Sequence, residues 1–363
     1  MSPVFSWRAW SLPVSISIWA FVVGCDSSEK NKSTSPSSAT PVVEGLSELA
    51  GSSGAVAIRF SPDGRMLASA HRERSIRLWD LQSRTPSATF TGHRWIAESL
   101  DWSPDGSLLA SAACDFATRQ TEIMIWDVST RKAVTTLQSQ DTGFAFVCFS
   151  PDGRTLASAG QRAITLWNVA TWTADRKFEP HNNPVRCLDF SPDGKLLAAG
   201  LSHYNTTSQS AEVRLWNTES GKEAGNLEHR WGIETVQFIG DGSILAVAAT
   251  GQFILWDVES QQHHQVIDTA AARASRVTIS SDGALVAMCG AKSLVLLETR
   301  TGKELAMIPA NQHFGTASFS LDGRLLAWPN SAPDGLIGLW EPARLQPVAV
   351  SPLHDGANHV PNQ

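Results

Sequence analysis

The residues of this chain whose types could do chemistry together lie between positions 93 and 126. His93, Ser111 and Asp115 supply an imidazole, a hydroxyl and a carboxylate, which are the three groups of a hydrolytic triad. In such a site the imidazole takes the serine proton, and a nearby oxyanion site holds the charge that develops on the substrate. A hydrolase interpretation therefore requires an exposed Ser111 with His93 beside it.

Candidates for metal or redox chemistry are scattered along the chain. Cys114, Cys148, Cys187 and Cys289 show no C-x-x-C spacing, so the sequence predicts neither a zinc site nor a dithiol redox motif. A disulfide between Cys148 and Cys187 stays open, although small buried thiols are the favoured interpretation. We expect no metal site and no cofactor.

The segments that must position these residues are copies of one repeat. Its most regular part is an aromatic residue followed by Ser-Pro-Asp-Gly, which first occurs at residues 60–64. Counted from the residue after the aromatic or Ile position, copies start at 61, 103, 150, 191, 239, 280 and 320, and the last three are looser. Self-similarity that returns at such a nearly constant period indicates a repeat architecture.

Each repeat is predicted to form four short strands. Apolar residues alternate before the turn, as Ile58 and Phe60 do, and Pro-Asp-Gly then makes a tight turn into a second strand. A third alternating strand, such as residues 76–79, ends in Trp in most copies, and a fourth apolar strand completes the unit. Four antiparallel strands of this length make one blade of a propeller.

The ends of the third strands carry a family motif. Trp-Asp pairs occur at residues 79–80, 126–127 and 256–257, with drifted versions at 167, 216, 297 and 340. Together with Gly92-His93, these motifs make residues 42–354 resemble the WD-repeat (G-protein-β-like) β-propeller family. The resemblance implies an all-β fold, a seven-bladed β-propeller of four-stranded antiparallel blades, with six or eight blades as alternatives. Residues 42–49 or 347–350 could complete the last blade, and we favour the first segment.

The resemblance also gives the residues of the second repeat a structural role. In this family the same four positions form a buried hydrogen-bond network, which here implies Asp115, His93, Ser111 and Trp126. We favour this network over a catalytic triad, because other repeats keep only parts of the set. The first repeat, for example, has Glu73 in place of the aspartate and no histidine.

Two repeats have longer connections between their second and third strands. The stretches from Ser111 to Trp126 and from Ala199 to Trp216 are longer than the corresponding stretches of most other copies. In the resembled fold these loops share one face with the histidine-containing loops, opposite the Pro-Asp-Gly turns. Aromatic and Arg residues on a rigid face are typical of protein-interface hot spots. The predicted binding face contains Arg72, Arg74, Trp95, Phe116, Arg119, Tyr204 and Trp231.

The N-terminal segment is typical of an export signal. In residues 1–24 a weakly positive start with Arg8 precedes an apolar run that is shorter than the roughly 20 residues of a membrane span. Residues 22–25, Val-Val-Gly-Cys, resemble the lipobox of bacterial lipoproteins, in which the exposed Cys, here Cys25, carries a diacylglyceryl group. An ordinary secretion signal with a chance Cys is the alternative. After the lipidated Cys25, the Ser-rich segment up to residue 41 is predicted to be a flexible linker, and residues 355–363 a polar tail.

Composition narrows the classes of partner. The net charge is −6, and no run of Lys or Arg exceeds two, which argues against a nucleic-acid partner. The sequence therefore predicts a monomeric, non-catalytic scaffold that binds a protein partner. We expect it to be exported and anchored by its lipid to a membrane of the bacterial envelope, with the propeller on the periplasmic side.

The alternative class of function is an enzyme or small-ligand sensor on a propeller fold, similar to lactonases or TolB. Such a protein would need acidic or histidine ligands that converge on the axis of the ring. The residues two before each turn form no such set: Arg59, Asp101, Cys148, Asp189, Gln237, Thr278 and Ser318. The identity of the protein partner lies beyond the sequence.

Overall fold

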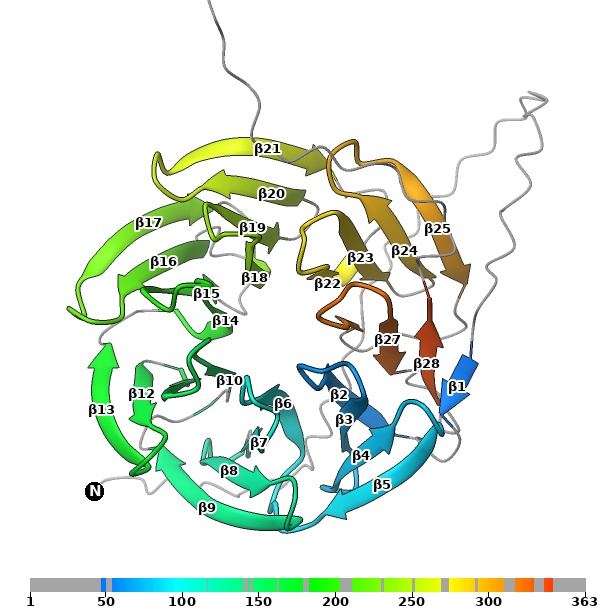
Figure 1. Ribbon diagram of the computed structural model, residues 1–363. Helices are drawn as coiled ribbons and strands as arrows, with labels where there is room; N and C mark the ends of the chain where they lie inside the picture. The colour runs from blue at the N-terminus through cyan, green and yellow to red at the C-terminus, as the bar shows by residue number, and fades with distance from the viewer. Residues whose placement is uncertain are drawn as a thin grey trace, which may run out of the picture. The chain divides into compact units, whose positions relative to one another are not determined.

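In a computed structural model of the chain, seven four-stranded antiparallel sheets stand as blades around a common axis (Figure 1). The chain divides into two units, Met1–Thr40 and Pro41–Gln363, and every residue that the structure describes belongs to the second. The described residues are 47–49, 54–115, 117–139, 143, 146–161, 163–178, 183–202, 211–229, 232–249, 252–268, 274–290, 293–309, 317–329 and 336–341. The prediction of an all-β, seven-bladed propeller is confirmed.

Within each of the first six blades the strands follow the chain from the axis to the rim. Blade 1 contains β2 (Ala55–Phe60), β3 (Met66–His71), β4 (Ile76–Asp80) and β5 (Thr85–Phe90), and blade 2 contains β6 (Ala97–Trp102), β7 (Leu108–Cys114), β8 (Thr121–Asp127) and β9 (Lys132–Ser139). Blade 3 contains β10 (Phe146–Phe149), β11 (Thr155–Ala159), β12 (Ile164–Asn168) and β13 (Thr173–Phe178), and blade 4 contains β14 (Val185–Phe190), β15 (Leu196–Ser202), β16 (Ala211–Asn217) and β17 (Glu223–His229). Blade 5 contains β18 (Ile233–Ile239), β19 (Ile244–Ala249), β20 (Gln252–Asp257) and β21 (Gln262–Asp268), and blade 6 contains β22 (Ala274–Ile279), β23 (Leu285–Gly290), β24 (Ser293–Glu298) and β25 (Glu304–Pro309).

Blade 7 joins the two ends of the repeat array. Its three inner strands are β26 (Ser318–Phe319), β27 (Leu326–Pro329) and β28 (Ile337–Trp340), and its outer strand is β1 (Ser47–Leu49). The first and last colours of Figure 1 meet there, because β1 pairs with β28 from Ser47↔Leu339 to Leu49↔Ile337. Leu49 is fully buried against the core shared with blade 1. The N-terminal segment therefore closes the ring, as predicted, whereas the competing residues 347–350 lie outside the described residues.

The core lies between neighbouring blades, and this explains the sequences of the strands. The second strand of a blade is covered on both faces, so strands such as β19 (ILAVAA) are apolar along their whole length. Small side chains such as Ala68, Ala70 and Ala110 are fully buried in these strands. They let adjacent sheets approach each other near the axis, where the blades converge.

The Ser-Pro-Asp-Gly turn is held by its own side chains. In blade 1, Ser61 Oγ donates to Asp63 Oδ1 (2.7 Å) and accepts the Met66 N–H (2.9 Å). Gly64 adopts a left-handed conformation, with φ 68°. The same pair of bonds recurs in blades 2, 3, 4, 6 and 7.

The turns also touch one another around the ring. A Cβ on Gly153 would lie 3.4 Å from Cδ of Pro104, and one on Gly242 would lie 2.8 Å from Cδ of Pro192. The proline of one blade thus packs on the turn glycine of the next blade. The motif therefore links successive blades as well as successive strands.

Strand direction places the loops on two faces. In blade 2 the pairing of β6 with β7 runs from Ala97↔Ala113 at one end to Trp102↔Leu109 at the other. The connections before β6 and after β7 thus share one edge of the sheet, which we call the loop face. The Ser-Pro-Asp-Gly turns lie at the opposite edge, the turn face, as predicted.

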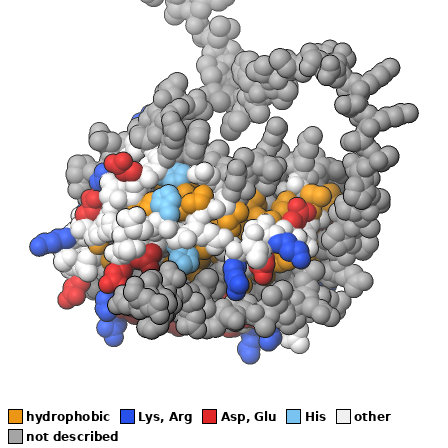
Figure 2. All heavy atoms as spheres, turned by 90° about the horizontal axis from the view of Figure 1, so that it is seen from above, with side chains coloured by type: hydrophobic (Ala, Val, Ile, Leu, Met, Phe, Trp, Pro, Cys, Tyr) orange, Lys and Arg blue, Asp and Glu red, His pale blue; other side chains and the backbone are white. Residues whose placement is uncertain are grey.

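The outer strands form a rim of mixed polarity. Figure 2 shows this rim on the side of β21, where acidic, basic and histidine side chains are interspersed with apolar ones. His263 and His264 are both exposed on β21. Among the residues that the structure describes, we find no helix with the length and hydropathy needed to cross a membrane.

The cysteines of the described residues are free thiols. Cys148 and Cys187 form no disulfide with each other, and Cys148 is buried. Burial raises the pKa of the Cys187 thiol to about 12, so it stays protonated and unreactive at neutral pH. The favoured prediction of small buried thiols is confirmed for Cys114, Cys148 and Cys289, whereas Cys187 is half-buried.

Candidate functional site

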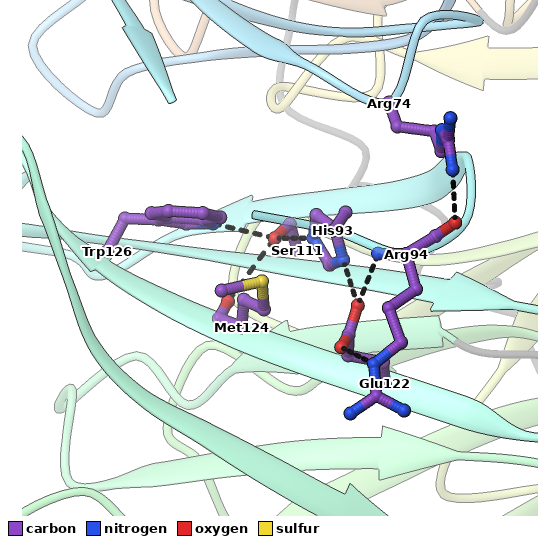
Figure 3. Close-up of polar contacts among 7 residues, drawn as sticks. All are labelled: Arg74, His93, Arg94, Ser111, Glu122, Met124 and Trp126. Carbon is purple, nitrogen blue, oxygen red and sulfur yellow. Dashed lines mark hydrogen bonds and ion pairs between the residues drawn. The ribbon is translucent and has the colours of Figure 1, made fainter. Parts of the chain in front are cut away.

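A chain of buried hydrogen bonds lies under the loop face of blade 2 (Figure 3). The Trp126 Nε1–H donates to Ser111 Oγ (2.8 Å), and Ser111 Oγ lies 2.6 Å from His93 Nε2. His93 Nδ1 in turn lies 2.9 Å from Glu122 Oε2. All four residues are buried. Three of them, His93, Ser111 and Trp126, are members of the network predicted from the sequence.

Strand register brings these side chains together. Glu122 and Trp126 are four residues apart on β8 and therefore project from the same face of the strand. Ser111 on β7 pairs with Met124, which stands between them. His93 reaches the network from the connection before β6, directly after Gly92, where an added Cβ would lie 3.2 Å from Met124 Cε. The glycine lets the backbone pass close over the strand.

The donors and acceptors of this network balance. Burial acts to raise the pKa of Glu122, but hydrogen bonds from His93 and from the Arg94 N–H lower it overall, so the carboxylate is ionised and accepts a hydrogen bond from His93 Nδ1. The free lone pair of His93 Nε2 then accepts the Ser111 hydroxyl, and Ser111 Oγ accepts the Trp126 N–H. Every polar atom in the network has a partner, and each bond contributes about 0.5–1.5 kcal/mol to stability.

The order of Glu, His and Ser in this network is that of a hydrolytic triad, yet it cannot work as one. Ser111 is 0% exposed, and its Oγ is engaged by both His93 and Trp126. A nucleophile must reach a substrate carbonyl, with an oxyanion site beside it. The network therefore fixes the loop before β6 to the blade.

The prediction that Asp115 is the acid of the network is wrong. Its carboxylate accepts the Ala117 N–H (2.9 Å) and the Thr118 hydroxyl (2.6 Å), and so closes the loop between β7 and β8. The reason is the length of the strands, because pairing continues to Ala113↔Glu122 and beyond. This places Asp115 past the end of β7 and Glu122 against His93. The sequence signal that was missed is Glu122 itself, which is an acidic residue within an apolar strand and lies on the same face as Trp126.

The predicted binding face is partly described. Arg72, Arg74 and Arg119 are exposed at the loop face, and Trp95 is half-buried against the core between blades 1 and 2. Phe116, Tyr204 and Trp231 lie outside the described residues. Sequence reasoning missed Arg94, whose only signal was its place directly after His93.

Arg94 connects the buried network to the surface. Its backbone N–H donates to Glu122 Oε2 (3.1 Å), and its Nε lies 3.7 Å from Glu122 Oε1. Its carbonyl oxygen accepts a hydrogen bond from Arg74 Nη1 of blade 1 (3.1 Å), as Figure 3 shows. The guanidinium carbon lies 5.9 Å from the centre of the Trp95 ring, which is within reach of a cation–π interaction.

Comparison with known proteins finds a family model that matches part of the chain. The sequence model described as "WD domain, G-beta repeat" matches four successive segments, residues 44–80, 84–127, 131–168 and 172–217. These four segments are therefore similar to WD repeats. In each of these segments the Trp that ends the third strand is followed by Asp or Asn, as it also is in the fifth unit, at Trp256-Asp257.

Similar proteins are known by sequence and by structure. Pre-mRNA-processing factor 19 of Oryza sativa subsp. japonica is 31% identical over 70 residues, which are 19% of this chain and 13% of that protein. Coronin-7 of Rattus norvegicus is 41% identical over 63 residues, 17% of this chain and 7% of that protein. The chain thus matches only a small part of either relative's length.

A solved structure extends the likeness to the whole ring. The Cps50 (Swd1) beta-propeller domain of Myceliophteria thermophila has a TM-score of 0.70 and 16% sequence identity, and the match covers 81% of this chain and 98% of that chain. At this identity the likeness establishes the fold, which agrees with the seven blades described above.

The network varies among the WD repeats. In blade 1, Trp79 Nε1–H donates to Ser69 Oγ (2.7 Å), which lies 2.7 Å from Nε2 of the buried His71. The expectation that this repeat has no histidine is therefore wrong, because His71 supplies the imidazole from β3 itself. Glu73 instead binds Ser75 and Arg77.

Later blades keep less of the network. In the WD repeat of blade 3, Trp167 Nε1–H donates to Ser158 Oγ (2.8 Å). In blade 5, Val247 occupies the serine position, and Nε1 of Trp256 has no hydrogen-bond partner among the described residues. The network therefore decays along the chain, as expected for structural bonds that contribute separately to each blade.

Near the axis of the propeller, the residues two before each turn connect neighbouring blades. Arg59 Nε pairs with Asp101 Oδ1 (3.0 Å), and Asp101 Oδ2 accepts the Phe149 N–H (2.7 Å). Asp189 Oδ2 likewise accepts the Phe238 N–H (2.7 Å) from the next blade. Within the described ranges no group of three His, Cys, Asp or Glu side chains is placed to hold a metal ion.

Proposed function

We propose that this chain is a non-catalytic protein-binding scaffold, exported as a single propeller and held at a membrane of the bacterial envelope by a lipid on Cys25. WD-repeat propellers generally bind protein partners, and this supports the same class of function here. The observation that carries the proposal is the loop face of blades 1 and 2. There Arg72, Arg74 and Arg94 are exposed, Arg94 lies over the ring of Trp95, and buried hydrogen bonds fix the loop of Arg94 before any partner arrives.

Prearranged side chains are what such a surface needs. Trp95 packs on the core between two blades. The hydrogen bonds of Glu122 with His93 and with the backbone N–H of Arg94 hold Arg94, the residue beside Trp95, in place. Little conformational entropy is then lost when a partner binds, so more of the contact energy appears as affinity. Aromatic and Arg side chains in this setting are the residues that dominate interface energies.

Replacing Trp95 with alanine should reduce capture of the partner at least tenfold, because it removes the aromatic anchor of the face. The measurement is chemical crosslinking in intact cells, followed by purification of the protein and quantitative mass spectrometry. Trp172→Ala is the matched control, because Trp172 is also half-buried but lies in the turn after β12, at the turn face. Undiminished capture by Trp95→Ala would place the binding surface elsewhere.

The lipid anchor is tested by metabolic labelling. Cys25→Ser should abolish incorporation of labelled palmitate and move the protein from the membrane to the soluble fraction, since two acyl chains gain about 0.8 kcal/mol per buried methylene. Ser27→Ala, in the same linker, should keep both the label and the membrane location. If the unaltered protein takes up no label, the anchor does not exist.

A further inference from the structure

We propose that the partner docks on the loop face through an acidic segment of its chain, bound by Arg72, Arg74, Arg94 and Arg119 around Trp95. We call these four arginines the arginine patch. The inference rests on the proposed protein-binding function and names the chemistry of the partner.

Contacts connect the loops that carry Arg74, Arg94 and Arg119, and Arg72 stands in the same turn as Arg74. Arg74 of blade 1 donates to the carbonyl of Arg94 in blade 2, and Arg94 lies over the ring of Trp95. Hydrogen bonds from Thr118, from the Ala117 N–H and then from the Trp95 side chain lower the pKa of Asp115, so the indole lies beside that loop. Arg119 closes the same loop, because its N–H donates to the Asp115 carbonyl (2.6 Å).

Three of the four guanidinium groups of the patch lack an anionic partner in the described part of the chain. Among the residues that the structure describes, Arg72, Arg74 and Arg119 form no ion pair: Arg74 binds a carbonyl, and Arg119 binds the side-chain oxygen of Gln161 (3.3 Å). Arg94 is close to Glu122, but its side chain is 67% exposed, and that carboxylate already accepts two other hydrogen bonds.

The nearby carboxylates are already engaged elsewhere. Glu73 is paired with Arg77 (2.6 Å), and Asp115 accepts the hydrogen bonds that close its own loop. The patch therefore keeps its positive charge on a chain whose net charge is −6.

The turn face shows the opposite pattern. Its cations lie next to the aspartates of their own turns, as in Arg65–Asp63 (3.9 Å), Lys195–Asp193 (3.3 Å) and Arg324–Asp322 (3.7 Å). Unpaired guanidinium groups on one face repel one another, and carboxylates that bind there relieve this repulsion. Arg is suited to this role because its planar fork binds a carboxylate through two parallel hydrogen bonds.

The surroundings of the patch favour a protein segment over a lipid surface or a nucleic acid. A lipid surface is bound through apolar side chains that enter the bilayer as well as through charge. The large exposed apolar residues of the described part are Val134, Val266 and Leu321, which lie on outer strands or at the turn face. A nucleic acid needs a continuous basic track, whereas Glu73 and Asp115 are interspersed with the arginines of the patch. A short acidic segment with an apolar side chain for Trp95 fits a patch of this size.

The test uses the full-length Cys25→Ser protein, which carries no acyl chain, and a fluorescein-labelled peptide EELEEELE. We expect this peptide to bind at least tenfold more tightly than QQLQQQLQ, and its binding to weaken as the salt concentration rises. The variant R74Q/R94Q/R119Q should lose at least tenfold in affinity. The control variant R65Q/R154Q/R324Q removes the same charge from exposed arginines of the turn face and should bind as the parent does.

Several outcomes would overturn the inference. Equal binding of the two peptides, or equal loss in the two triple variants, would show that the patch does not select carboxylates. Binding to mixed vesicles of phosphatidylcholine and phosphatidylglycerol but not to EELEEELE would assign the patch to lipid. If R74Q/R94Q/R119Q keeps the crosslinked partner while Trp95→Ala loses it, the scaffold function stands and the acidic partner is wrong. If both variants keep the partner, both proposals fail.

Discussion

Replacing Ser111 with alanine is expected to lower the free energy of unfolding by about 3 kcal/mol, because two buried nitrogens lose their partner. Ser111 Oγ is the central atom of the blade 2 network, where it joins Trp126 Nε1 and His93 Nε2. Without it both nitrogens are left buried and unpaired, and each such group costs about 1–3 kcal/mol. Chemical unfolding followed by tryptophan fluorescence measures the change.

The same substitution in blade 3 provides the control. Ser158 stands at the equivalent position and accepts the Trp167 N–H, but none of the histidines that the structure describes bonds to it. Ser158→Ala should therefore cost less, about 1 kcal/mol, because it leaves one buried donor unpaired instead of two polar nitrogens. The difference between the two variants reports the His93 part of the network. Equal costs in the two blades would mean that His93 adds nothing to stability.

The fold was predictable from the sequence because the pattern of strands and turns that forms one blade occurs seven times. The turn motif recurs in register, and its Ser side chain accepts the same backbone N–H bond in nearly every copy. Closure by the N-terminal strand was also predictable, because a ring with an open edge is unfavourable. The packing of Pro104 on Gly153 was not predictable, because it depends on how neighbouring blades tilt.

The site was less predictable, because it depends on where strand pairing stops. Asp115 has the expected distance in sequence from Ser111, and Glu122 does not. The pairing of β7 with β8 runs past the expected loop, and this exchanged the roles of the two acids. His71 was missed for a similar reason, since it reaches Ser69 along its own strand instead of from a separate loop. The exposed Arg72, Arg74 and Arg119 were predicted individually, but the absence of anionic partners for them among the described residues depends on the three-dimensional arrangement of the loops.

Stability is expected to depend on pH through Asp189. Burial raises the pKa of Asp189 to about 7, and neighbouring Asp101 adds to the increase, while the Phe238 N–H and Arg59 oppose it. Between about pH 4 and pH 7 the folded protein therefore keeps a proton that the unfolded chain has released. The free energy of unfolding falls as pH rises through this window, and the whole contribution is lost above pH 7.

Asp189→Asn should remove this dependence. The amide oxygen can still accept the Phe238 N–H but carries no charge at any pH, so the variant should be more stable than the parent at pH 8 and similar to it near pH 4. A difference of roughly three pKa units corresponds to at most about 4 kcal/mol. Because Asp189 is only half-buried, solvent screening should reduce the gain at pH 8 to about 2 kcal/mol.

Asp193, an aspartate of a turn, serves as the control, because its pKa is shifted in the opposite direction. A hydrogen bond from Ser191 lowers the pKa of the exposed Asp193, so its ionised form stabilises the fold at pH 8, and this contribution is lost as pH falls below the ordinary value of about 4. Asp193→Asn should therefore lose less than about 1 kcal/mol at pH 8. Chemical unfolding of the parent and both variants at pH 5 and pH 8 separates the two effects. If Asp189→Asn keeps the parent's change in stability between these two pH values, the charge near the axis does not limit the stability of the ring.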